Sequence, residues 1–137
     1  MRSRIFLFVA LIAIAASALA ADTKIYTSYE TVRQALLKTS LADVQSSAKQ
    51  LANVARAEKQ NSVAAKADAV ATANDITAAR TAFAALSDAV IKFGGKNRPL
   101  VVAWCAMERK SWLQPKGEIA NPYVAPSMRK CGEVKAD

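Results

Sequence analysis

Apolar residues between positions 25 and 93 recur at the spacing of an α-helix. The clearest run has separations of three and four residues, which place its members on one helical face: Ile76, Ala79, Phe83, Leu86, Val90 and Phe93. Asn74 or Asp75 can cap the start of this helix, and Gly94-Gly95 supplies a stop. The pattern therefore predicts a helix over 76–93.

Three further helices are predicted before it. Thr39-Ser40 interrupts an otherwise continuous stripe, and Ser40 with Asp43 three residues later resembles a capping box. Gln60-Asn61-Ser62 is the expected turn before a third, alanine-rich segment over 63–72. The first two stripes comprise Ile25, Tyr29, Val32 and Leu36, then Leu41, Val44, Ala48, Leu51 and Ala55.

The helical pattern stops before Pro99. Residues 100–104 suit a short strand or an extended segment that ends in Trp104, and both cysteines, Trp112 and three prolines follow them. We therefore expect an all-α fold, in which residues 22–95 form a small up-and-down helical bundle. Residues 96–137 should form an irregular C-terminal cap of loops and short turns.

The N-terminus has the pattern of a secretory signal peptide. Arg2 and Arg4 precede an uninterrupted apolar run, and Ala18-Leu19-Ala20 provides the small-x-small pattern of a cleavage site. A retained membrane anchor is the competing interpretation, but the uncharged run is at the short limit for a span. We expect residues 1–20 to be removed, leaving one domain over 21–137. The protein would then be exported, periplasmic or secreted, with no attachment to a membrane.

Composition narrows the possible functions. The chain has no histidine, which excludes histidine-based catalytic triads and histidine-ligated metal sites. The two cysteines are not in a Cys-x-x-Cys motif, so a thiol-disulfide oxidoreductase is disfavoured. The formal net charge is +8, and from Lys92 onward nine basic residues face four acidic ones. An exported chain without a recognition motif is not expected to bind nucleic acid. We therefore predict a protein that is not an enzyme.

Sulfur-containing residues form the one candidate site. The site would offer two thiolates and two thioethers, a set of soft ligands that suits Cu(I) or Ag(I). These ligands are Cys105, Met107, Met128 and Cys131. Basic residues follow or precede each cysteine and should lower the pKa values of the two thiols. They are Arg109, Lys110, Arg129 and Lys130. The alternative is a Cys105–Cys131 disulfide, which an exported chain with two cysteines favours. A disulfide and a dithiolate metal site exclude each other.

The C-terminal third also resembles a known family. Four short motifs are similar, in order and spacing, to those of an exported bacterial domain family of unknown function. They are Cys105-Ala106-Met107, Ser111-Trp112-Leu113, Asn121-Pro122-Tyr123 and Met128-x-x-Cys131-Gly132. Members of that family stand alone or are fused to periplasmic adaptor subunits of copper/silver efflux pumps. Two departures stand out: Ala106 replaces a proline, and Val124-Ala125 replaces an aromatic residue followed by glycine.

The resemblance implies a helical bundle with a sulfur-containing cap and a role in binding soft metals. It points to Cys105, Met107, Met128 and Cys131 as ligands of Cu(I) or Ag(I), and to a periplasmic efflux adaptor as a partner. We expect a scaffold role in the cap for five residues: Trp104, Trp112, Asn121, Pro122 and Tyr123. The alternative function is a disulfide-stapled interaction module that binds no metal.

Overall fold

The computed structural model describes residues 22–136, and the predicted signal peptide lies outside this range. Its helical part contains a first helix, described over 22–37, then α2 (Leu41–Ala57), α3 (Asn61–Ala71) and α4 (Ile76–Gly94). The predicted helices are thus present. Within residues 22–136, no helix is long and apolar enough to cross a membrane.

Local capping explains where the helices begin. The Ser40 side chain accepts a hydrogen bond from the Asp43 amide at the start of α2, and Asp75 accepts one from the Ala78 amide at the start of α4. α4 ends at Gly94, and the capping residue after it, Gly95, has a positive φ of 54°. The predicted turn at 60–62 is wrong by two residues. Lys59 takes the left-handed conformation, with φ of 59°, so α3 already begins at Asn61.

The C-terminal third is more ordered than predicted, and the expectation of a purely all-α fold is wrong. β1 (Val101–Cys105) pairs antiparallel with β2 (Lys110–Gln114) on one side and with β3 (Glu133–Val134) on the other. A short 3₁₀ helix, η1 (Pro126–Met128), precedes β3. We call residues 101–136 the cap. The expected strand over 100–104 is present as β1, but the remainder of the cap was predicted only as loops and turns.

The sequence does not predict the hairpin between β1 and β2 because its turn contains no glycine. Arg109 occupies the left-handed position instead, with φ of 54°, and its amide donates to the Cys105 carbonyl at 2.8 Å. A left-handed non-glycine residue leaves no strong signal in a sequence.

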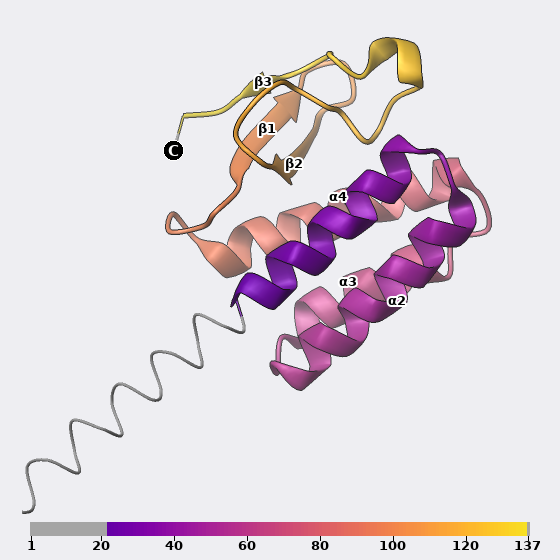
Figure 1. Cartoon of the computed structure of the whole chain (residues 1–137), viewed down its shortest axis with the longest axis vertical. Coiled ribbons are helices and arrows are strands. Elements are labelled where there is room, and N and C mark those ends of the chain that lie inside the picture. The colour runs from indigo at the N-terminus through magenta and orange to yellow at the C-terminus, as the bar shows by residue number, and fades with distance from the viewer. Residues whose placement is uncertain (1–21, 137) are drawn as a thin grey trace, which may run out of the picture.

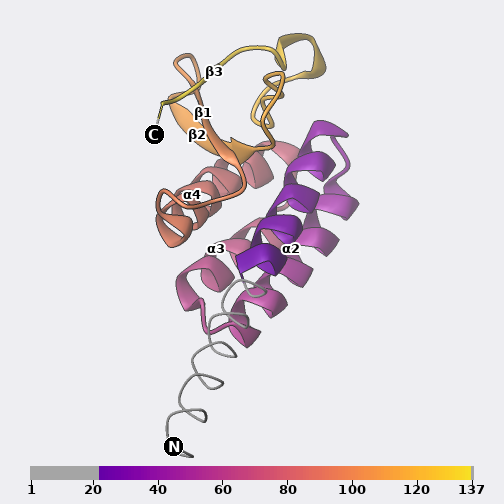
Figure 2. The same cartoon turned by 60° about the vertical axis from the view of Figure 1, so that its left-hand side comes forward.

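The cap lies over the first helix and α4, while α2 and α3 lie on the far side of that pair (Figure 1; Figure 2 gives the turned view). Aromatic rings fill the junction. Tyr29 of the first helix stacks on Phe83 of α4 with ring centroids 5.1 Å apart, and Tyr123 of the cap lies 5.9 Å from Phe83. Trp112 of β2 meets the edge of Tyr123 at 6.0 Å and is completely buried.

Buried hydrogen bonds join the same elements. The hydroxyl of Tyr29 lies 2.7 Å from Ser87 Oγ of α4 and accepts a hydrogen bond from the Leu113 amide of β2. The hydroxyl of Tyr123 donates to the Ser111 carbonyl at 2.6 Å and also contacts Ser87 Oγ. Burial raises the pKa of both phenols well above the ordinary value, so both stay neutral at physiological pH.

Candidate functional site

The two thiols meet between the end of β1 and the segment that precedes β3. Cys105 is the last residue of β1, and its side chain is completely buried. Cys131 lies between η1 and β3 and is partly exposed. The two Sγ atoms are 3.1 Å apart, although 26 positions separate the residues. The fold therefore brings together the two thiols that both sequence-based hypotheses require, and both are free thiols in the structure.

The backbone around Cys131 is held from both sides. Its amide donates to the Met128 carbonyl at 2.9 Å, which closes a turn. Its carbonyl accepts a hydrogen bond from Asn121 Nδ2, also at 2.9 Å. Gly132 follows with φ of 143°, and a Cβ at this position would lie 2.7 Å from the Trp112 ring. The backbone of Cys131 is thus held both by a local turn and by Asn121 and Trp112, which are distant in the chain.

The expected scaffold residues occupy different positions. Asn121 is completely buried, donates to the Cys131 carbonyl and accepts from the Tyr123 amide. Trp112 and Tyr123 lie at the junction with the helices. Pro122 is buried, and its carbonyl accepts a hydrogen bond from Arg80 of α4. Trp104 is only partly buried, and Lys135 Nζ lies 4.6 Å above its ring.

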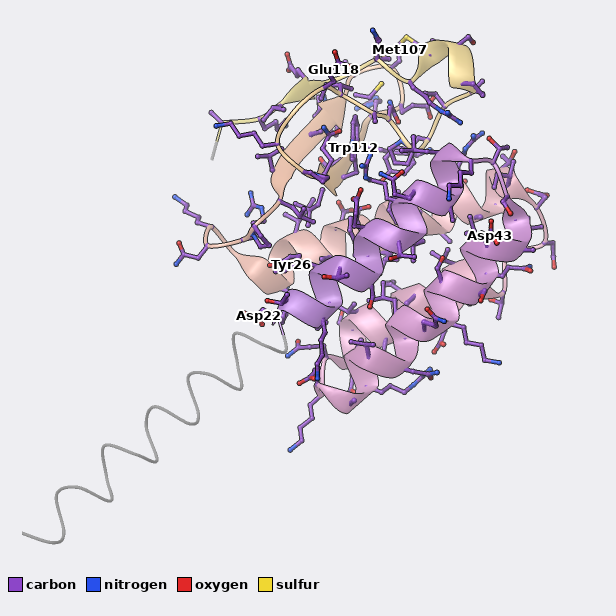
Figure 3. The ribbon with its side chains drawn as sticks, in the orientation of Figure 1. Asp22, Tyr26, Asp43, Met107, Trp112 and Glu118 are labelled. Atoms are coloured by element: carbon purple, nitrogen blue, oxygen red, sulfur yellow. The ribbon has the colours of Figure 1, made fainter. Side chains whose placement is uncertain are left out.

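The methionines are not equivalent. Met107, with 63% of its surface exposed, lines a hollow of about 230 Å³ together with Cys131. The other lining residues are Trp104, Ala106, Gly132 and Glu133. Met128 ends η1 and is 41% exposed, but it does not line this hollow. Figure 3 shows Met107 at the outer edge of the cap and Trp112 on the side facing the helices.

The electrostatic environment of Cys131 differs from the prediction. The contact with Cys105 raises the pKa of the Cys131 thiol, and desolvation and the negative charges of Cys105 and Glu108 act in the same direction. Lys110 pairs with Glu108 at 3.4 Å and lies over the Tyr123 ring. The expectation that flanking basic residues lower the pKa of this thiol is therefore wrong.

Two arginines of the helices position the cap, and sequence reasoning did not identify them. Arg33 of the first helix is buried, pairs with Glu30 and donates to the Ala120 carbonyl at 2.8 Å. Arg80 donates to the carbonyls of Pro122 and Val124. Each arginine falls within a helical stretch where an exposed basic residue is ordinary, so the sequence gives no signal of this role.

The described residues contain no group of three or more histidine, cysteine or acidic side chains that could hold a metal ion. No protein-family model matches this chain, and neither a curated protein nor a solved structure matches it.

Proposed function

We propose that this chain is an exported accessory protein that binds Cu(I) or Ag(I) through Cys105, Cys131 and Met107. The observation that carries the proposal is the 3.1 Å approach of the two Sγ atoms, at a hollow that Met107 also lines. Two thiolates and a thioether form a soft donor set, which selects monovalent copper or silver over ions that prefer oxygen ligands.

Metal binding requires a small movement of the thiols. Metal–sulfur bonds of about 2.3 Å place two ligating sulfurs about 4.0–4.6 Å apart, for trigonal or linear coordination. The Sγ atoms would therefore separate by about 0.9–1.5 Å from the observed 3.1 Å. Cys131 is the side chain able to move, because it borders the open hollow, whereas Cys105 is enclosed.

The resemblance of the cap motifs to exported domains that accompany copper/silver efflux systems supports the same proposal. We propose that the protein passes its metal to a periplasmic efflux adaptor by ligand exchange. The exposure of Met107 supports this step, because an incoming sulfur ligand can reach the metal from the side of the hollow. The protein would act as a carrier rather than an enzyme.

An anaerobic titration of the reduced protein with Cu(I), against a competing chromogenic chelator, tests the proposal. We expect one tightly bound Cu(I) per chain, and loss of this binding in Cys131→Ser. Met107→Leu should weaken the binding, whereas Met128→Leu is the matched control and should leave it unchanged. Failure of the reduced wild-type protein to compete with the chelator would refute metal binding.

The same thiol contact favours a second function. Sulfurs at 3.1 Å need to approach by only about 1 Å to form a disulfide, for which the S–S distance is about 2.05 Å. A permanently oxidised protein would be a disulfide-stapled interaction module that binds no metal. Treating the purified protein with excess reduced glutathione and then counting free thiols distinguishes the two functions: the metal carrier regains two free thiols, whereas the stapled module keeps its disulfide and has none.

A further inference from the structure

The two thiols differ sharply in access to solvent. The Cys105 side chain is completely buried, and its strand is hydrogen-bonded on both sides, to β2 and β3. Cys131 forms part of the wall of the open hollow. A reagent larger than water can therefore reach Cys131 directly, but it can reach Cys105 only after the cap opens.

We infer that this pair undergoes thiol–disulfide exchange with a small-molecule disulfide, with Cys131 as the attacking thiol and Cys105 as the resolving thiol. The product is an intramolecular Cys105–Cys131 disulfide. This inference deepens the proposed function and rests on it in one respect: the disulfide consumes both thiolates and so releases the metal. Thiol oxidation would then control metal loading.

The exchange has two balanced steps. The Cys131 thiol loses its proton to solvent, and its thiolate attacks one sulfur of the incoming disulfide, forming a mixed disulfide and releasing one thiolate. Cys105 then loses its proton and attacks Cys131 Sγ, which releases the second thiolate. Two protein thiols are oxidised and one small disulfide is reduced to two thiols, so no other oxidant is required.

The geometry favours the second step. Cys105 Sγ already lies 3.1 Å from Cys131 Sγ, and two hydrogen bonds hold the Cys131 backbone at Met128 and Asn121. A mixed disulfide on Cys131 therefore keeps its sulfur within reach of the resolving thiol. The adduct should be short-lived because the attacking group is prepositioned.

The hollow suits a small disulfide in size. Its volume of about 230 Å³ accommodates part of a small peptide, and the group attached to Cys131 would occupy it. Lys135 Nζ lies over the Trp104 ring, which lines the hollow, and Lys130 is an exposed neighbour of Cys131 in the chain. Acidic groups stand against these two cations, because Glu133 lines the hollow and the charge of Glu108 acts on Cys131, so size and access rather than charge define the disulfide that can react.

Glutathione disulfide is the probe for the test. Reduced wild-type protein, Cys105→Ala and Cys131→Ala are each incubated with it without oxygen, and intact masses are followed over time. We expect the wild-type protein to lose two hydrogens without a lasting adduct. Cys105→Ala should accumulate one glutathione adduct, and Cys131→Ala should form its adduct at least about tenfold more slowly because its remaining thiol is buried.

Two results would overturn the inference: equal adduct rates in the two variants, or a lasting adduct on the wild-type protein. Circular dichroism establishes that each variant is folded. If a variant is unfolded, brief alkylation of the native wild-type protein followed by peptide mapping replaces it, and Cys131 should be labelled first. Labelling of Cys105 first would contradict the assignment.

A Cu(I) titration of the oxidised and reduced wild-type protein completes the test. Loss of Cu(I) binding on oxidation, and its recovery after reduction, is the expected result. Exchange with the expected asymmetry in a protein that never binds Cu(I) would support the roles of the two cysteines and refute the metal function. Full Cu(I) binding by the oxidised protein would refute control by oxidation.

Discussion

The helical part and the cap are stabilised in different ways. Residues 22–94 bury repeating stripes of alanine, valine and leucine, so many small contacts of similar kind hold the helices together. The cap depends on a few individual contacts, most of them between a side chain and a distant backbone group, such as those made by Arg33, Arg80 and Asn121. A single substitution in the helices should therefore lower the free energy of unfolding by a small amount, and one in the cap should lower it by more.

Removal of the largest cap side chain is the strongest test of this difference. Trp112→Ala should lower the free energy of unfolding by about 3–5 kcal/mol, because the buried ring also supports Gly132 and Tyr123. Val70→Ala in α3 is the comparison in the helices, with an expected loss of about 2 kcal/mol. Urea unfolding measures both values. Equal losses would show that the cap is no more dependent on single residues than the helices are.

Oxidation of the thiol pair should stabilise the cap specifically. A disulfide that closes the 26-residue interval between Cys105 and Cys131 is expected to raise the free energy of unfolding by about 3.5 kcal/mol. Urea unfolding of oxidised and reduced protein measures the gain. Cys131→Ser treated with the same oxidant is the control and should not gain stability. A wild-type protein that is destabilised by oxidation would indicate that the disulfide distorts the cap.

Alkaline pH should weaken the junction between the helices and the cap. Tyr29 and Tyr123 have pKa values raised by burial, whereas in the unfolded chain they ionise near pH 10. Above that pH the unfolded state binds fewer protons than the folded state, so stability falls as pH rises. Each phenol contributes about 1.4 kcal/mol per pH unit. Because the unfolded phenol is only half ionised at pH 10, the fall in unfolding free energy between pH 10 and pH 11 should be smaller in Tyr123→Phe than in the wild-type protein by about 1 kcal/mol.

A helix cap should give the smallest effect. Asp75→Ala removes the side chain that accepts from the Ala78 amide, and should cost about 1 kcal/mol. Gln60→Ala is the matched control, because Gln60 occupies the same position before α3 but makes no capping hydrogen bond with its side chain. Thermal unfolding of both variants measures the difference. Equal shifts of the midpoint would show that the Asp75 bond contributes no stability.

The same contrast explains which parts of the fold could be predicted. Helical periodicity and capping residues are local signals, so the four helices were predicted with only small errors at the α2–α3 turn. The β1–β2 hairpin turns through Arg109 without a glycine, and β3 has only two residues. Neither feature has a local sequence signature. The third strand forms only because β1 pairs with residues 133–134, about 30 positions later in the chain.

The candidate site was predictable in part for the same reason. Cysteine and methionine are rare enough in this chain for their spacing to single out four sulfur residues. The sequence could not show that Met107 shares the hollow with Cys131 while Met128 does not, because this depends on how the hairpin turn and η1 are placed. Nor could it show that the negative charge of Glu108, rather than a basic residue, acts on the pKa of the Cys131 thiol.

The bond between Arg33 and the Ala120 carbonyl has a consequence for the order of folding. It joins residues 87 positions apart, so a ribosome has completed most of the chain before the partner of this buried guanidinium emerges. Until then the first helix has only Glu30 with which to neutralise Arg33. The helices should consequently reach their final packing late, after synthesis of the cap, and a chain truncated before residue 120 should remain a loosely packed intermediate susceptible to proteolysis.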